Sequence, residues 1–152
     1  PMMSAIHEAY YQKLLESLKF FQGDEGVIRE LIRAEIDKKN ILNLLKAKES
    51  NVDKEILSKH LIDIGRIPAK ELLDIYETKD VVEIVGRIES YYKLNEALEQ
   101  YKTENSLIIF EIELTKLINT NYVKKLRNIA LSIGTIFYFI FYFLNFKIFK
   151  KK

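Results

Sequence analysis

Apolar residues recur every three or four positions along most of this chain, and few helix-breaking residues interrupt them. This spacing places apolar side chains on one face of an α-helix. The 152 residues include only 5 glycines and 2 prolines, the residues that break helices and populate turns. The sequence therefore predicts an all-α fold of long helices with short connections, and its 48% hydrophobic content is enough to bury a core.

Turn and capping residues divide this pattern into helices. Gly23 follows the first apolar stripe, which contains Ile6, Tyr10, Leu14, Leu18 and Phe21, and Asp24 and Asp53 are candidate caps for the next two helices. Pro68 suits the first position of a further helix. Asn119-Thr120-Asn121 could kink or break the last long stretch. The predicted helices cover residues 6–21, about 25–48, about 54–64, 69–76, about 81–101 and 107–131.

One polar residue falls on a predicted apolar face. Asn40 lies four residues from both Ile36 and Leu44, and a buried Asn must find hydrogen-bond partners. A structural polar contact between helices is the simpler interpretation, and a ligand-binding role is the alternative. A weaker pattern is the resemblance between Glu35-Ile36-Asp37 and Glu111-Ile112-Glu113, which hints at a repeated helical unit.

The residue types that carry chemistry are scarce. The chain has no cysteine, which excludes disulfides and thiolate metal sites and favours a cytoplasmic setting. His7 and His60 are the two histidines, and we expect both to be ordinary surface or half-buried residues. There is no Gly-rich phosphate loop, nucleophile–base pair or HExxH motif. We therefore expect no catalytic residues, no cofactor and no metal site, and the sequence does not identify binding residues.

Charge is distributed unevenly between the main body and the end of the chain. The formal net charge is +2. Residues 123–152 contain seven basic and no acidic residues, which leaves 17 basic and 22 acidic residues, a net charge of −5, in the rest of the chain. A mildly acidic body with interleaved charges is not typical of a nucleic-acid-binding protein.

The segment 128–146 differs from the rest because it contains no charged residue. Phe137 to Leu144 is nearly all aromatic. About 18 or more apolar residues in a row indicate a candidate transmembrane helix. Basic residues flank both ends, so charge predicts no orientation. One hypothesis is therefore a small protein with a cytoplasmic helical domain and a single C-terminal membrane anchor.

Several motifs instead resemble the C subunit of archaeal and bacterial A-type (V-type-like) ATP synthases. The family shows a Glu-Ile-Asp-x-x-Asn-Ile core followed by a Leu-Leu-Arg/Lys-x-Lys ending, which matches Glu35 to Lys48 here. Leu61-Ile62-Asp63-Ile64-Gly65-Arg66-Ile67 resembles the family's connector before its next helices. Leu131 to Phe139 resembles a further signature. The similarity covers roughly residues 6 to 139.

The resemblance implies an all-helical, funnel-shaped protein of three similar helical units, without a catalytic site. Such a protein lies peripherally on the cytoplasmic side of the membrane. It receives the D and F subunits of the central stalk and couples them to the membrane rotor ring for proton or sodium transport. The resemblance implies neither nucleotide binding nor a membrane-spanning segment in the chain itself.

The chain departs from the family pattern after Phe139. Residues 140–152 contain Phe, Tyr, Ile, Asn and Lys where the family continues with a charged helix. We therefore expect an incomplete helical domain over residues 1–139 and an aberrant apolar and basic tail over 140–152. Within the apolar run, the family-like Ser132-Ile133-Gly134-Thr135-Ile136 favours a buried helix of a bundle over the membrane anchor.

Overall fold

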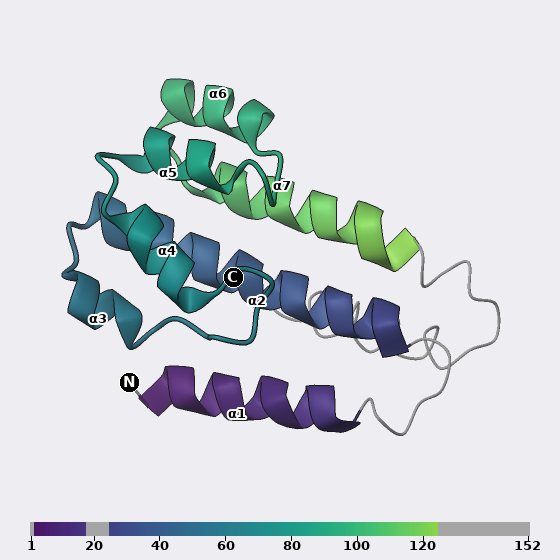
Figure 1. The fold of residues 1–152 in the computed structure, drawn as a ribbon. Coiled ribbons are helices and arrows are strands. Elements are labelled where there is room, and N and C mark those ends of the chain that lie inside the picture. The colour runs from purple at the N-terminus through teal and green to yellow at the C-terminus, as the bar shows by residue number, and fades with distance from the viewer. Residues whose placement is uncertain (1, 18–24, 125–152) are drawn as a thin grey trace, which may run out of the picture.

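The computed structural model describes residues 2–17 and 25–124, and the regular elements within these ranges are all helices (Figure 1). This result confirms the predicted all-α fold. The predicted cap Asp24 and the segment 128–146 lie outside the described residues. The elements are α1 (Met2–Ser17), α2 (Glu25–Glu49), α3 (Lys54–Ser58), α4 (Ala69–Tyr76), α5 (Val81–Ile88), α6 (Asn95–Glu104), α7 (Ile108–Ile118) and the π-helix η2 (Asn119–Val123).

Helix α2 is the central element of the fold. It runs through the middle of the molecule, with α1 on one side and α7 on the other, both antiparallel to it (Figure 1). The short helices α3 to α6 gather around the C-terminal half of α2. Because neighbours surround it, α2 buries residues on nearly every side, as expected for a helix in the middle of a bundle. Its residues with less than 2% exposure are Ile28, Ala34, Ile36, Asp37, Asn40, Ile41, Leu44 and Leu45.

Two predicted helices are shorter in the structure. The helix expected to reach residue 64 ends at Ser58, and a loop over residues 59–68 follows. The stretch expected to be helical from 81 to 101 is divided into α5 and α6. At this break, the backbone amides of Tyr91 and Tyr92 both donate to the Ile88 carbonyl, at 2.9 and 3.0 Å. Tertiary contacts of the intervening residues override the local helical pattern.

The helix caps agree only partly with the predictions. Asp53 occupies the residue before α3, but its side chain makes no capping hydrogen bond. Pro68 immediately precedes α4, one position earlier than predicted. Asp80, which was not predicted to be a cap, accepts a hydrogen bond from the Glu83 amide at 3.0 Å. Asn105 ends α6 with φ of 50°, a left-handed conformation that Asn tolerates better than most residues.

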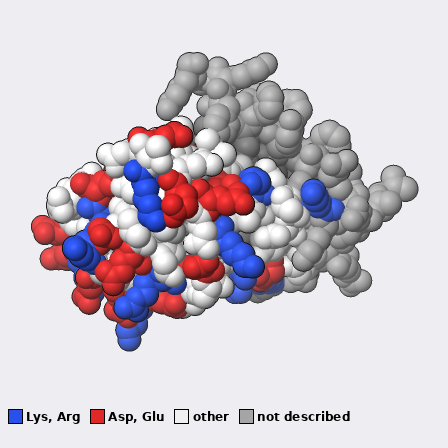
Figure 2. Space-filling model, turned by 90° about the horizontal axis from the view of Figure 1, so that it is seen from above, with Lys and Arg blue, Asp and Glu red and all other residues white. Residues whose placement is uncertain are grey.

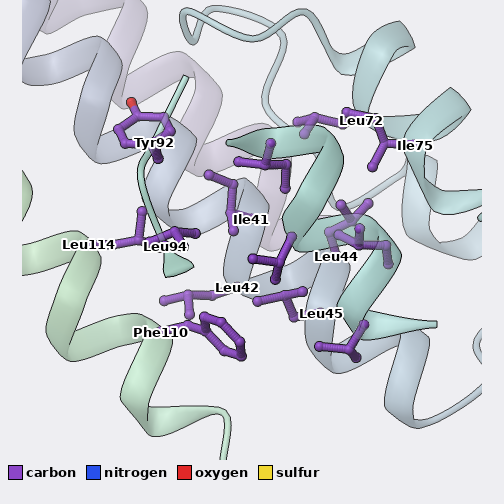
Figure 3. Packing of buried hydrophobic residues seen from close by; sticks show 14 of the residues in the cluster. Ile41, Leu42, Leu44, Leu45, Leu72, Ile75, Tyr92, Leu94, Phe110 and Leu114 are labelled. Carbon is purple, nitrogen blue, oxygen red and sulfur yellow. The ribbon is translucent and has the colours of Figure 1, made fainter. Parts of the chain in front are cut away.

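The larger of two hydrophobic clusters, which we call the large cluster, joins the C-terminal half of α2 to α4, α5, α6 and α7 (Figure 3). Phe110 of α7 has no exposed surface and lies 5.3 Å, between ring centroids, from Tyr101 of α6. Side chains from α2, α4 and α7 point toward one another in this region. The labelled members in Figure 3 are Ile41, Leu42, Leu44, Leu45, Leu72, Ile75, Tyr92, Leu94, Phe110 and Leu114.

The second, small cluster lies around the N-terminal half of α2. Its buried members are Ile28, Leu31, Ile32, Ala34, Ile36, Ile62 and Ile118, and Tyr11, Leu14, Leu15, Val27, Ile64 and Tyr122 pack against them. Helix α1 contributes Tyr11, Leu14 and Leu15 to this packing. The predicted stripe was therefore only partly right, because Ile6 and Tyr10 are 56% and 55% exposed. The packed face of α1 is rotated away from them.

The surface carries interleaved charges of both signs, in agreement with the charge pattern of the sequence (Figure 2). The proposed sequence repeat does not correspond to equivalent environments. Ile36 and Asp37 have no exposed surface, whereas Ile112 is 62% exposed and Glu113 pairs with Lys116 at 3.2 Å. Among the described helices, none combines the length and the apolar character that a membrane crossing requires.

Candidate functional site

The most developed polar arrangement in the described residues is centred on Asp37, which has no exposed surface. Its Oδ1 atom accepts hydrogen bonds from the backbone amides of Arg66, at 2.9 Å, and Ile67, at 3.1 Å. Its Oδ2 atom accepts from the Tyr92 hydroxyl at 2.7 Å. A single buried carboxylate therefore holds both the 59–68 loop and the turn between α5 and α6.

Asn40 lies one helical turn after Asp37 and holds the same loop at a second point. Its Nδ2 donates to the Ile62 carbonyl at 2.8 Å, and its Oδ1 accepts from the Ile62 amide at 3.0 Å. The expected structural polar contact is thus present, but its partner is loop backbone instead of another helix. Both loop groups are buried, so the amide satisfies a donor and an acceptor that water cannot reach. We call Asp37 and Asn40 the polar clamp.

Two further side chains secure the ends of the loop. Asn43, three residues after Asn40, donates to the His60 carbonyl at 3.3 Å. Asp63 accepts from the Ala69 amide at 2.8 Å, which satisfies a free donor at the first turn of α4. The loop is consequently attached to α2 by three residues spaced three apart on one helix face, Asp37, Asn40 and Asn43. Asp63 attaches it to the first turn of α4. Hydrogen bonds of this kind satisfy the polar groups of the loop and hold it against the core.

Gly65 allows the loop to approach α2 closely enough for these bonds. A Cβ atom added at this position would collide with Oδ1 of Asp37 and would lie 3.3 Å from Cγ2 of Ile36. Only glycine therefore leaves room for the backbone above the carboxylate without displacing it. The requirement here is close approach and not an unusual backbone conformation.

The Arg66 side chain makes three further contacts, one of which reaches η2. Its Nη1 donates to the Tyr122 hydroxyl of η2 at 2.8 Å. Its Nε lies 3.6 Å from a Glu30 carboxylate oxygen of α2, and its guanidinium carbon lies 5.9 Å from the Tyr92 ring centroid. The Arg66 side chain is 35% exposed, so this part of the network reaches the surface.

Burial dominates the electrostatics of the clamp. It raises the pKa of Asp37 above its ordinary value, against the opposing effect of the three hydrogen bonds and the Arg66 charge. Burial also raises the pKa of Tyr92, helped by the adjacent Asp37 carboxylate. Tyr92 is therefore a neutral hydrogen-bond donor at physiological pH.

These contacts suit a structural role. Both carboxylate oxygens of Asp37 are engaged by protein donors, and no group of three or more His, Cys, Asp or Glu side chains that could hold a metal occurs in residues 2–17 and 25–124. Neither histidine joins the clamp: His7 is half-buried on α1, and the exposed His60 lines a shallow groove of about 300 Å³ beside α2 and α3. The arrangement can hold the 59–68 loop rigidly between the large and the small cluster.

Helical spacing indicated Asn40. The family-like motifs contain Asp37, Gly65 and Arg66 but predicted no role for them, and no pattern indicated Tyr92. In the sequence, Asp37 stands out only as part of the Glu35-Ile36-Asp37 triplet. Its position three residues before Asn40 was a usable signal, because residues with this spacing share a helix face. Nothing in the local sequence indicated that Tyr92, 55 residues further on, would meet it.

Comparison with known proteins gives a consistent result. The model of the family described as ATP synthase (C/AC39) subunit matches residues 1–143. The C subunit of the A-type ATP synthase of Thermoplasma volcanium is 35% identical over 140 residues, and that of Thermoplasma acidophilum is 32% identical over 140 residues. Each alignment covers 92% of this chain and 39% of the relative.

A more distant relative is the corresponding protein of Methanocaldococcus jannaschii, 31% identical over 110 residues, which are 70% of this chain and 27% of the relative. The chain thus spans about two fifths of the length of its Thermoplasma relatives. No solved structure matches it significantly. On the strength of the match over residues 1–143, this chain belongs to the ATP synthase (C/AC39) subunit family.

Proposed function

We propose that the chain forms part of a non-catalytic component of an A-type ATP synthase, which couples the central stalk to the membrane rotor ring during proton or sodium transport. The observation that carries the proposal is the family match over residues 1–143. The Thermoplasma relatives, both named as C subunits of A-type ATP synthases, support it. The proposed partners are the D and F subunits of the stalk and the rotor ring, and the proposed location is peripheral, on the cytoplasmic side of the membrane.

The polar clamp is compatible with such a role. A protein that transmits torque must resist deformation between the surfaces that its partners hold. Loops are ordinarily the softest parts of a protein. Here Asp37 and Asn40 join the 59–68 loop to the longest described helix through four hydrogen bonds, and a fifth, from Tyr92, adds the turn between α5 and α6. We therefore propose that the clamp makes this part of the protein rigid, and we propose no chemical step for the chain.

Reconstitution tests the proposal. The purified chain is mixed with D and F subunits and with the isolated rotor ring, and co-migration in size-exclusion chromatography is measured beside ATP hydrolysis by the chain alone. We expect binding to the stalk subunits or the ring and no hydrolysis. The Asp37→Asn variant, which retains the shape of the clamp, is the matched control and should bind equally well.

Two results would contradict the proposal. One is the absence of binding by a folded chain. The other is intrinsic ATP hydrolysis that Glu35→Gln or Glu111→Gln abolishes, because a non-catalytic protein has no carboxylate whose loss could stop a reaction. A preparation of Glu16→Gln, altered on the exposed side of α1, controls for contaminating hydrolases.

We further propose that residues 140–152 add nothing specific to this function. Their aromatic and basic composition lacks the polar face of a soluble helix, and exposed apolar surface promotes aggregation or membrane association. Expression of 1–139 and 1–152 in parallel should give more soluble protein for the shorter form. Stable insertion of the longer form as a single span, with loss of a measurable activity in the shorter one, would instead support the membrane-anchor hypothesis.

A further inference from the structure

The end of α7 has an unusual backbone. After Ile118 the helix continues without a break as η2, a five-residue π-helix in which the Lys124 amide donates to the Asn119 carbonyl. The sequence Asn119-Thr120-Asn121 was expected to kink or break the helix, and the structure shows a widened turn in its place. π-Helices are rare and are frequently found at functional sites.

The polar contact that meets this turn comes from the 59–68 loop. The Tyr122 hydroxyl of η2 accepts a hydrogen bond from Arg66 Nη1 at 2.8 Å. The Tyr122 side chain also packs against the small cluster, of which Ile118 is a buried member. Burial raises the pKa of Tyr122, so the hydroxyl stays neutral near physiological pH.

Arg66 is well placed to act on η2 because its backbone and its side chain have separate tasks. Its backbone amide donates a hydrogen bond to Asp37, which fixes the position from which the side chain extends. Its guanidinium then contacts Tyr122 on one side and Glu30 of α2 on another. The side chain therefore spans from the N-terminal half of α2 to the end of α7, across the edge of the small cluster.

We infer that the Arg66 side chain is a latch that holds the π-helical end of α7 against the N-terminal half of α2. When the latch is released, Asn119–Val123 opens locally, while the packing of the large cluster and the hydrogen bonds of the polar clamp at Asp37 remain intact. The latch is a conformational device, so it stands whether or not the chain couples a stalk to a rotor ring. One residue thus has two tasks, a backbone anchor and a side-chain latch.

A double-mutant cycle with amide hydrogen exchange tests the latch. The variants are Arg66→Gln, Tyr122→Phe and their combination, and Arg87→Gln, at an exposed arginine of α5, is the control. Tyr122→Phe keeps the ring in the small cluster and removes only the hydroxyl. We expect each single variant to raise exchange at the Lys124 amide roughly fivefold, the effect of losing one hydrogen bond of ordinary strength.

The pattern across the cycle decides the outcome. A latch predicts that the double variant exchanges no faster than either single variant, because both remove the same contact. It also predicts unchanged exchange at the Arg66 and Ile67 amides, which the polar clamp protects, and no effect of Arg87→Gln. Multiplying effects in the double variant, equal acceleration throughout the protein, or unchanged exchange at Lys124 would each overturn the inference.

Discussion

The two halves of α2 are stabilised in different ways. Its C-terminal half is surrounded by α3 to α7 and contributes to the large cluster, in which the buried residues are apolar. Its N-terminal half contributes to the small cluster, to which α1, the 59–68 loop and the end of α7 each supply only a few side chains. Because fewer apolar groups are buried there, apolar burial stabilises that half less than the C-terminal half.

The polar clamp lies where the two halves meet. Ile36 belongs to the small cluster and Ile41 to the large one, and Asp37 and Asn40 lie between them in the sequence. Asn40 binds Ile62 of the small cluster, whereas Asp37 binds Ile67 and Tyr92 of the large cluster. One short loop, fixed by two buried polar side chains, therefore connects two cores that share a single helix.

Removing the central aromatic residue of the large cluster should have the largest effect. Phe110 has no exposed surface, so Phe110→Ala creates a cavity and should lower the free energy of unfolding by about 4 kcal/mol. Ile112→Ala on the same helix removes a side chain that is 62% exposed and should cost less than about 0.5 kcal/mol. Urea denaturation followed by circular dichroism measures both. Similar losses for the two variants would show that α7 does not pack as described.

Substitutions at Asp37 test whether polar contacts, and not apolar burial, hold the junction. Asp37→Leu leaves the amides of Arg66 and Ile67 and the Tyr92 hydroxyl without their acceptor, and should cost about 3 kcal/mol. Asp37→Asn keeps an acceptor oxygen for the two amides and should change stability by less than about 1 kcal/mol. The same denaturation measurement applies. A leucine variant as stable as the asparagine variant would show that the carboxylate site accepts an apolar group.

Gly65→Ala should have an intermediate effect, because the added methyl group would collide with the Asp37 carboxylate. We expect a loss of about 2 kcal/mol, the usual size of an overpacking effect. Gly86→Ala is the matched control, since a Cβ there has no neighbour within 4 Å and α5 gains a better helix former. Gly86→Ala should be neutral or stabilising. Equal losses at both positions would argue against close approach at Gly65.

The smallest expected effect is a pH dependence of the clamp. Folding raises the pKa of Asp37 above its ordinary value of 3.8, so the folded state binds the proton more tightly than the unfolded state does. The associated stability is fully present below pH 3.8 and is lost as the pH rises through the folded pKa. The unfolding free energy of the wild type, measured relative to Asp37→Asn, should therefore fall between strongly acidic and neutral pH. A rise over that range would show that the hydrogen bonds outweigh burial.

Much of the fold follows from local sequence, and the limits of that inference are physical. The long apolar pattern of α2 predicted its bounds to within one residue, because a helix buried on nearly all sides is apolar along its whole length. The pattern failed at residues 59–64 and 89–94, where Asn40 and Asp37 bind groups of the distant chain in place of continued helix. Asn40 was detectable as a polar residue on an apolar face, but contacts 22 to 55 residues apart leave no periodic signal.

The most direct test of the clamp is the hydrogen exchange of three loop amides, those of Ile62, Arg66 and Ile67. These amides belong to a loop, and exposed loop amides exchange through small local openings. Because Asn40 and Asp37 accept their hydrogen bonds inside the core, we predict exchange as slow as that of the central α2 amides at Ile41 and Leu44. Exchange at the rate of the exposed turn at Ser50 and Asn51 would contradict the clamp.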